Sequence, residues 1–433
     1  MVWVDGLLSA SGGGEWGFVI GQRISGEQAL PSAGRTLILS PERLVRHVLV
    51  MGATGSGKTE TAMRLAYTIA SESQAPVFYL DGKGDRRGAE RFLGLMALAG
   101  RDARVFPMHA FDGWRGEAHE IQNRLLEIIE YSAEGPASWY RDVAKTVLML
   151  ACQHPDGPPR SSRQLLERLD YRVLTAAHGR AGAAGALTAD LVRQVRLRYE
   201  AFFGSCRGQL DGQWAWEDTN AAYLLIDSLA LKDEAGSLAR FLFEDFTHYF
   251  TTRKARNEFC VLIVDEFSAL ARAGSMASRI EQARGFHTAL VLAPQVAAGM
   301  GDETETARIM GSAETVICHR VSTPQDIVEL AGTRLRMEHS VQYADTGATG
   351  VGTARRQHQY KIDPNSVRSL ENGEAYIISR GHATRARIAQ APAAHAPLPK
   401  RMQPATATQP QAHTQPAAGI LSTKSPQPQG LPY

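Results

Sequence analysis

Residues 47–59 read His-Val-Leu-Val-Met-Gly-Ala-Thr-Gly-Ser-Gly-Lys-Thr, and this stretch decides the fold. The apolar run 47–51 predicts a short strand, and the apolar spacing of residues 60–70 predicts a helix. A glycine-rich loop between a strand and a helix is the context of a phosphate-binding loop, because its backbone N–H groups and the helix N-terminus both attract anions. The alternative is a glycine-rich turn with a surface lysine, but the two flanking elements favour the phosphate loop.

Each residue of the loop has an expected task. Lys58 should reach the β- and γ-phosphates of a nucleotide, and Thr59 should place its hydroxyl on Mg²⁺. ATP and Mg²⁺ are therefore the expected cofactors. The phosphates should be cradled by the backbone of the whole loop, which comprises Gly52, Ala53, Thr54, Gly55, Ser56, Gly57, Lys58 and Thr59.

A second strand ends in two acids. The apolar residues 261–264 are followed by Asp265 and Glu266, which places two carboxylates at the edge of a buried strand, where α/β sheets bind ligands. Asp265 should hold Mg²⁺, directly or through water, and Glu266 should act as the general base for an attacking water. Strands that end in acids are common, so this pattern gains weight only from the phosphate loop upstream. The tandem acids favour a hydrolase over a kinase.

The bulk composition bounds the class of protein. The chain has 433 residues, of which 44% are apolar and 21% charged, an ordinary balance for a globular protein of more than one domain. The net charge of +2 indicates that any contact with DNA must come from a local basic surface. The four cysteines form no CxxC pair, as expected for reduced thiols. No apolar run is long enough to span a bilayer and no signal peptide is recognisable, so a cytoplasmic location is expected.

Short apolar runs alternate with helical patterns along much of the chain, which predicts an α/β fold with a mainly parallel central sheet covered on both faces. The predicted strands are 16–24, 36–39, 47–51, 77–80, 103–108, 221–227, 259–264, 289–293 and 314–319. The predicted helices are 60–70, 88–99, 120–131, 138–151, 162–177, 188–203 and 233–252. The first two strands are expected at an edge of the sheet.

These patterns predict three parts. Residues 1–109 and 219–389 should form a nucleotide-binding domain, and residues 110–218, which show only helical spacing, should form an all-helical insertion. Residues 390–433 are rich in Pro, Ala and Gln and contain no acid, so they are expected to be a disordered basic tail.

Taken together, residues 47–59, the turn Asp81-Gly82-Lys83-Gly84-Asp85 and the sequence Val264-Asp265-Glu266 resemble type IV coupling proteins. These are ring-forming motors of conjugation and type IV secretion within the FtsK/HerA class of DNA-pumping ATPases. The resemblance runs from about residue 34 to residue 389. It includes an aromatic-led helix at 138–150, a helical domain inserted between strands of the nucleotide domain, and a terminal region at 362–378.

The resemblance implies two further site residues. Arg284 matches the position of the family's arginine finger, which reaches the nucleotide of the neighbouring subunit, and Gln295 matches a sensor of the γ-phosphate. Arg284 could instead pair with an acid such as Glu281, and Gln295 could simply cap a strand end. Arg320 and Arg334 compete for the finger role, and Lys83 could be a second phosphate contact, an interface contact or a solvated loop lysine.

The resemblance implies an ATP-hydrolysing RecA-like motor, a homo-hexamer, that couples DNA or a relaxase–DNA complex to a type IV secretion channel. Its expected partners are DNA, a relaxase or other secreted cargo, secretion components and a separate membrane anchor that would hold it at the inner membrane. Most coupling proteins begin with transmembrane helices, which this sequence lacks. It could be truncated, a soluble member docked on a membrane protein, or a motor branch that never anchors. A DNA translocase that works with a nuclease and a recruitment adaptor with little turnover remain alternatives.

Candidate DNA contacts are scattered. Basic clusters occur at Arg86, Arg87 and Arg91, at Arg160 and Arg163, and at Arg355, Arg356, His358 and Lys361. Such clusters are more often solvated surface, and Trp214 and Trp216 are expected in a core or interface rather than stacked on bases. The cargo, the strand preference, the direction of translocation and the oligomeric state are not determined by the sequence.

Overall fold

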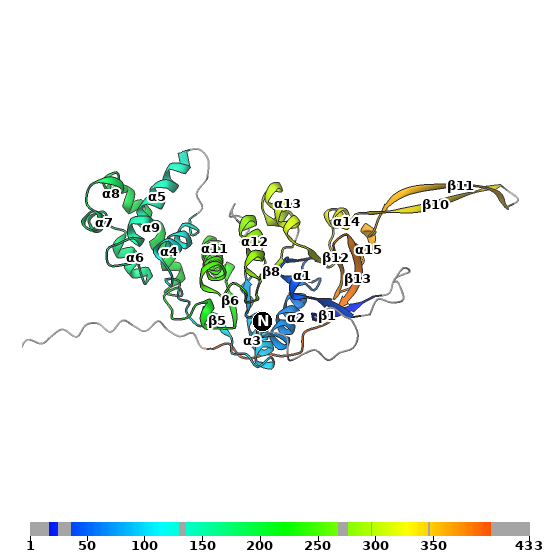
Figure 1. The fold of residues 1–433 in the computed structure, drawn as a ribbon, viewed down its shortest axis with the longest axis horizontal. Coiled ribbons are helices and arrows are strands. Elements are labelled where there is room, and N and C mark those ends of the chain that lie inside the picture. The colour runs from blue at the N-terminus through cyan, green and yellow to red at the C-terminus, as the bar shows by residue number, and fades with distance from the viewer. Residues whose placement is uncertain are drawn as a thin grey trace, which may run out of the picture.

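The computed structural model describes residues 17–24, 36–129, 136–266, 276–295, 297–344 and 347–399. Within them an eleven-stranded sheet has the order β2-β1-β13-β12-β9-β3-β8-β7-β4-β6-β5 (Figure 1). Seven neighbouring strands run parallel: β9 (Thr315–Cys318), β3 (Val48–Met51), β8 (Thr288–Ala293), β7 (Cys260–Asp265), β4 (Val77–Asp81), β6 (Ala221–Leu225) and β5 (Arg104–Phe106). The expected α/β fold with a mainly parallel sheet is confirmed.

An antiparallel edge extends this sheet beyond β9. It consists of β12 (Glu374–Ser379), β13 (His382–Ile388), β1 (Phe18–Arg23) and β2 (Thr36–Leu39). The two N-terminal strands therefore lie at an edge of the sheet, as their sequence predicts.

Helices cover both faces of the parallel strands because alternate strand residues point to opposite sides. In β3, Val48 and Val50 join the core beneath α2 (Lys58–Glu72) and α3 (Arg86–Leu98). Leu49 and Met51 join the opposite core, which includes residues of α11 (Asp233–His248) and α12 (Met276–Ala283). Smaller helices complete this domain: α1 (Pro41–Leu44), α10 (Ser228–Leu231), α13 (Glu303–Ser312), α14 (Gln325–Ala331) and α15 (Pro364–Arg368), with short turns η2 (Tyr249–Arg253), η4 (Arg284–Phe286) and η5 (Ala297–Met300).

In the described part of the segment between β5 and β6 there are six helices, which gather at one end of the molecule (Figure 1). They are α4 (Ala118–Leu126), α5 (Pro136–Cys152), α6 (Ser162–Arg168), α7 (Tyr171–His178), α8 (Gly182–Gly185) and α9 (Ala189–Cys206), followed by the turn η1 (Trp216–Asp218). The single helix predicted at 162–177 is wrong. Asp170 ends it by accepting hydrogen bonds from the N–H groups of Arg172 and Val173, which starts a new helix. Trp214 and Trp216 are buried, as expected.

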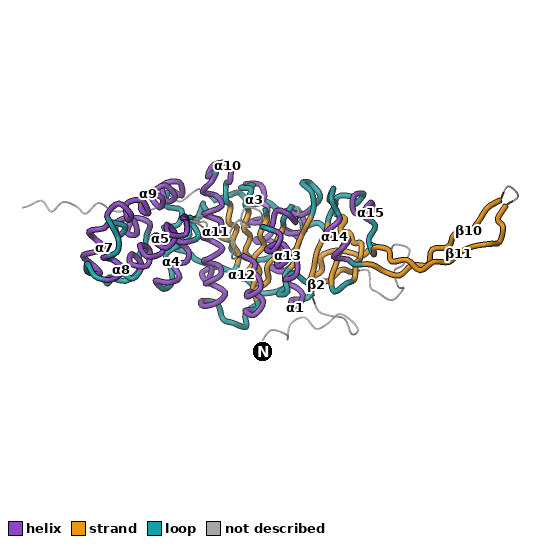
Figure 2. Tube along the Cα trace, turned by 90° about the horizontal axis from the view of Figure 1, so that it is seen from above, coloured by secondary structure: helices purple, strands orange, loops and turns teal. Residues whose placement is uncertain are grey.

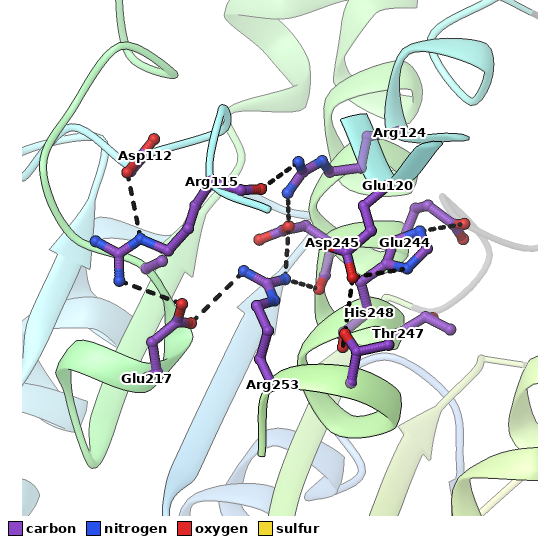
Figure 3. A network of polar contacts seen from close by, with 12 residues as sticks. Asp112, Arg115, Glu120, Arg124, Glu217, Glu244, Asp245, Thr247, His248 and Arg253 are labelled. Carbon is purple, nitrogen blue, oxygen red and sulfur yellow. Dashed lines mark hydrogen bonds and ion pairs between the residues drawn. The ribbon is translucent and has the colours of Figure 1, made fainter. Parts of the chain in front are cut away.

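A buried ion-pair network joins this helical part to the nucleotide domain (Figure 3). Arg124 of α4 pairs with Asp245 of α11, and both side chains are fully buried. Arg253 adds a second contact to Asp245 at 2.7 Å. Arg279 of α12 donates to Glu127, next to α4, at 2.7 Å and pairs with Glu244 of α11 at 2.8 Å. Three helices from distant parts of the sequence are thus held together by buried and largely buried charges.

Replacing Arg124 by Met should lower the free energy of unfolding by about 3–5 kcal/mol, because it leaves Asp245 as a buried carboxylate with one cation instead of two. Urea denaturation followed by tryptophan fluorescence measures this loss. The matched control is Arg163→Met, which removes an exposed helical pair with Glu167 and should cost about 0–1 kcal/mol. Equal effects of the two substitutions would contradict the role assigned to the buried pair.

The segment after β13 differs from its prediction. Residues 390–399, assigned to a disordered tail, form an extended strap across α2 and α3. The N–H of Ala391 donates to Glu60 Oε1 at 2.8 Å, and the N–H of Ala396 donates to the carbonyl of Glu90 at 2.9 Å. A Cβ on Gly94 would lie 2.5 Å from the backbone nitrogen of His395, so only glycine permits this approach. The rest of the predicted tail, 400–433, lies outside the described residues.

A long β-hairpin was not predicted. Strands β10 (Thr333–Ala344) and β11 (Gly347–Tyr360) pair with each other alone and project from the end of the molecule opposite the helices α5–α9 (Figures 1 and 2). None of the helices in the described part of the chain is long and apolar enough to cross a lipid bilayer.

Candidate nucleotide-binding site

The glycine-rich loop joins β3 to α2, as predicted. Gly55 and Gly57 adopt φ of 76° and 115°, which side chains rarely tolerate, and a Cβ on Gly52 would lie 2.4 Å from Ser56 Oγ. Lys58 is buried and donates to the carbonyls of Gly52 at 2.6 Å and Ala53 at 3.2 Å. Its ammonium therefore lies inside the loop. Burial, followed by the nearby charge of Lys83, lowers the pKa of Lys58.

The two acids of β7 lie beside this loop. Thr59 Oγ1 donates to Asp265 Oδ2 at 2.8 Å, and the Tyr79 hydroxyl donates to the same oxygen at 3.1 Å. Thr59 and Asp265, the predicted magnesium ligands, are thus brought together although β3 and β7 are separated in the sheet by β8. The donors are a hydroxyl and a carboxylate, the hard oxygen ligands that Mg²⁺ prefers, and a site completed by nucleotide phosphates needs only one or two protein ligands. The residues present therefore fit the ion.

The Glu266 carboxylate contacts two other side chains. Gln295 Nε2 donates to both of its carboxylate oxygens, at 3.0 and 3.2 Å, and Lys83 Nζ lies 3.2 Å from Oε2. Lys83 also lies 3.7 Å from Asp265. Burial by itself would lower the pKa of Lys83. The nearby carboxylates of Asp265 and Glu266 outweigh this effect and raise the pKa. Glu266 has a φ of 62°, an uncommon conformation for a residue other than glycine, so its side chain is held in a defined direction.

The register of parallel strands explains why these groups meet. Asp81 of β4 pairs with Asp265 of β7, and Asp265 pairs with Ala293 of β8, so all three strands end at one edge. Lys83 and Gln295 each follow their strand end by two residues. Asp81 accepts from the N–H groups of Lys83 and Asp85, both at 2.8 Å, which fixes the turn that carries Lys83.

Arg284 is not brought to this site. It lies in η4, just before β8 begins, at the sheet edge opposite the glycine-rich loop, and its charge contributes to lowering the pKa of His47 at the start of β3. Arg284 is exposed, and among the described residues no carboxylate lies within ion-pair distance of it. Its suggested partner Glu281 instead pairs with Arg308 at 2.8 Å. Arg284 therefore has no part in the site of its own chain.

Several residues around the site were missed from the sequence. Tyr79, whose hydroxyl bonds Asp265, stacks on Tyr223 with ring centroids 4.9 Å apart, and Tyr223 donates to Asp81 at 2.9 Å. The sequence held one indication of the role of Tyr79, because it stands two residues before Asp81 and therefore on the same face of the strand. His319 follows β9 and contacts Thr61 Oγ1 at 2.8 Å and the carbonyl of Glu374 at 2.8 Å. No sequence signal distinguishes it from an ordinary core histidine.

Both histidines beside β3 are buried as neutral rings. Burial lowers the pKa of His319 and of His47 to about 4. Between pH 6.5 and 4 these histidines are protonated in the unfolded chain, where their pKa is near 6.5, but stay neutral in the folded chain. The free energy of unfolding therefore decreases as the pH falls from about 6.5 towards 4.

Lowering the pH from 7 to 5 should therefore reduce the free energy of unfolding by about 2 kcal/mol for each of these histidines. Denaturation curves at the two pH values measure the change. In the variant His319→Gln, the part of the pH-dependent change in the free energy of unfolding that comes from these two histidines should be about half as large, because only His47 remains. An unchanged pH dependence in this variant would show that His319 is not buried as a neutral ring.

The glycine-rich loop, the paired acids and the parallel sheet define a RecA-like P-loop nucleotide-binding fold with a helical insertion. Comparisons with known proteins show which families of this fold the chain resembles. Residues 27–97 match the family model of the HerA-like helicase C-terminal domain. The chain is 26% identical over 124 residues to the type 4 coupling protein DotL of Legionella pneumophila, a match that spans 29% of this chain and 16% of that protein.

Solved structures share the fold over most of the chain. The bacterial conjugative coupling protein TrwBΔN70 superposes with a TM-score of 0.63 at 17% identity, covering 91% of this chain and 98% of that one. VirB4 of Thermoanaerobacter pseudethanolicus superposes with a TM-score of 0.54 at 13% identity, covering 87% and 97%. The resemblance to type IV coupling proteins of the FtsK/HerA class, suggested by the sequence motifs, is therefore confirmed.

Proposed function

We propose that this chain is an ATP-hydrolysing motor that couples DNA, or a relaxase–DNA complex, to a type IV secretion or conjugation channel. The observation that carries the proposal is the meeting of Lys58, Thr59, Asp265, Glu266 and Gln295 at one strand edge. A similar fold has been solved in TrwB with ADP and Mg²⁺, at 17% identity and a TM-score of 0.60, which supports the same cofactors here.

The proposed chemistry follows from the positions of these side chains. Lys58 would exchange its contacts with loop carbonyls for phosphate oxygens, and Thr59 and Asp265 would hold Mg²⁺, which when bound offsets phosphate charge. Glu266 would orient a water and accept its proton. Gln295 keeps the Glu266 carboxylate pointing to the site. Lys83, now paired with Glu266, adds a cation at the position where negative charge is to be bound.

We further propose that the motor is a homo-hexamer in which Arg284 of one subunit completes the site of the next. Its exposed position, remote from its own loop, supports a role in trans. The helical part α4–α9 and the tail after residue 399 are proposed to recruit cargo. Contact with secretion components and a separate membrane anchor would hold the protein at the inner membrane. The division into domains at residues 109, 218 and 389 belongs to the same proposal.

The test is steady-state ATP hydrolysis by the purified chain, alone and with single- or double-stranded DNA, with Mg²⁺ or with excess chelator. Turnover that requires Mg²⁺ and rises with DNA is expected, and the strand form that stimulates more identifies the substrate. ATP binding without turnover under any of these conditions would contradict the motor and favour a recruitment adaptor. DNA-stimulated turnover that depends on a nuclease partner would favour a translocase of DNA processing.

A further inference from the structure

The β10–β11 ribbon, residues Thr333–Tyr360, exposes apolar side chains on one face in the part whose side chains are described, 333–338 and 354–360. Paired residues of an antiparallel ribbon share a face, and the register pairs Leu335 with His358, Met337 with Arg356 and Thr333 with Tyr360. This face, here called the apolar face, exposes Leu335, Met337 and Tyr360 by 62%, 47% and 47%. The other face carries Arg334, Arg336, Glu338 and Arg355.

Along β10 the sequence also separates apolar residues on one face from polar residues on the other. Its odd positions hold Leu335, Met337, Val341 and Tyr343 together with Thr333 and His339, whereas its even positions are polar or small: Arg334, Arg336, Glu338, Ser340, Gln342 and Ala344. Apolar residues at alternate positions are typical of a strand with one buried face. A two-stranded ribbon in water is at best marginally stable, so a surface that packs on the apolar face would stabilise it.

The charge of the ribbon points to what that surface is. Residues 333–360 contain four basic and two acidic side chains, a net charge of +2, and the segment from residue 390 adds +3 without an acid. Since the whole chain has a net charge of +2, all other residues together carry −3. The body of the chain is therefore opposite in charge to its own ribbon, and opposite charges favour association. The ribbon projects away from that body (Figures 1 and 2), so its own body does not cover it, and a second copy offers a surface of the same negative net charge.

We propose that the β10–β11 ribbon is an assembly arm, which packs its apolar face on the body of a second copy of this chain. Strands of 12 and 14 residues reach about 40 Å, the width of a small domain, which is enough to cross a boundary between subunits. The inference rests on the homo-oligomer of the proposed function and names the element that forms it. Tyrosine, methionine and arginine, all present on the apolar face, are enriched at protein interfaces.

Two faces of one ribbon allow a matched test. Leu335→Thr with Met337→Thr removes the apolar stripe and keeps strand-forming residues. Arg336→Thr with Arg355→Thr is the control, because it makes the same number of changes on the opposite face. Mass photometry of the full chain with ATP and Mg²⁺ measures assembly. The first variant should weaken self-association by at least about 30-fold, the effect of losing one central interface residue, whereas the control removes two peripheral charges and should weaken it by less than about 5-fold.

A crosslink locates the contact directly. All four native cysteines are buried, so Met337→Cys provides a selective site for a benzophenone maleimide. Irradiation of labelled chains mixed with unlabelled chains that are isotopically heavy should give crosslinks between the two populations, mapped by mass spectrometry to the body of the heavy chain. Crosslinks within one chain only would overturn the proposal.

Other outcomes would also overturn it. Normal assembly of both double variants would show that the ribbon is not the arm. Normal assembly combined with loss of DNA binding in the arginine variant would make it a nucleic-acid contact instead. A wild-type chain that stays monomeric yet hydrolyses ATP would refute the arm but not the proposed activity, whereas ribbon-dependent assembly without turnover would do the reverse.

Discussion

Replacing Glu266 by glutamine is expected to lower ATP turnover by about 10²–10⁴-fold while ATP still binds, because the amide keeps the shape of the carboxylate but cannot accept a proton. Gln295 and Lys83 contact this carboxylate at 3.0 and 3.2 Å, and Glu266 has a positive φ, so the position of the carboxylate is well defined. Single-turnover hydrolysis together with binding of a fluorescent ATP analogue separates the two effects.

The matched control is Glu329→Gln on the exposed face of α14, which should leave turnover unchanged. A Glu266→Gln protein with more than about a third of wild-type turnover would show that Glu266 is not the base. Loss of ATP binding in the same protein would instead indicate that the acid serves the metal, as proposed for Asp265.

Replacing Arg284 by alanine is expected to lower turnover by about 10³–10⁵-fold if this guanidinium acts on the site of a neighbouring subunit. ATP binding to the chain itself should not change, since Arg284 lies at the sheet edge opposite its own loop. Arg308→Ala, which removes a nearby exposed pair with Glu281, is the local control and should have little effect.

Mixing distinguishes action in trans from damage to the fold. Arg284→Ala has an intact loop, and Lys58→Ala has an intact Arg284, so neither variant alone should hydrolyse ATP. In mixed assemblies some interfaces place the intact loop of an Arg284→Ala chain next to the intact Arg284 of a Lys58→Ala chain. Turnover should therefore recover to part of the wild-type rate. Activity of Arg284→Ala alone at the wild-type level would reject the finger, and failure to recover on mixing, with assembly intact, would reject its action in trans.

The elements that the sequence predicts well are those with strong local signals. Residues 47–59 specify strand, loop and helix without help from the rest of the chain, because glycine spacing and apolar periodicity act within a few residues. The strand that ends at Asp265 and Glu266 is predicted for the same reason. The helix at 162–177 failed because a single aspartate, Asp170, is enough to restart a helix, and its pattern of apolar residues continues across the break.

Non-local features escaped prediction. The polar alternation of the β10–β11 ribbon is a clear strand signal once the pairing is known, but nothing in the sequence shows that the hairpin leaves the sheet. The strap at 390–399 has the composition of a disordered tail, yet it is held by Glu60 and by the space above Gly94. Composition measures how much apolar area a segment could bury, not whether a groove exists to receive its backbone.

The phosphate loop and the alternating strands and helices follow from residues that are close together in the chain, and the two acids gain their meaning from the loop far upstream. The tertiary structure decided which of these groups meet. Thr59 and Asp265 are 206 residues apart and come within 2.8 Å only because parallel strands end at one edge. The same packing brings Lys83 and Gln295 to Glu266 and carries Arg284 to the opposite edge of the sheet, away from the loop of its own chain.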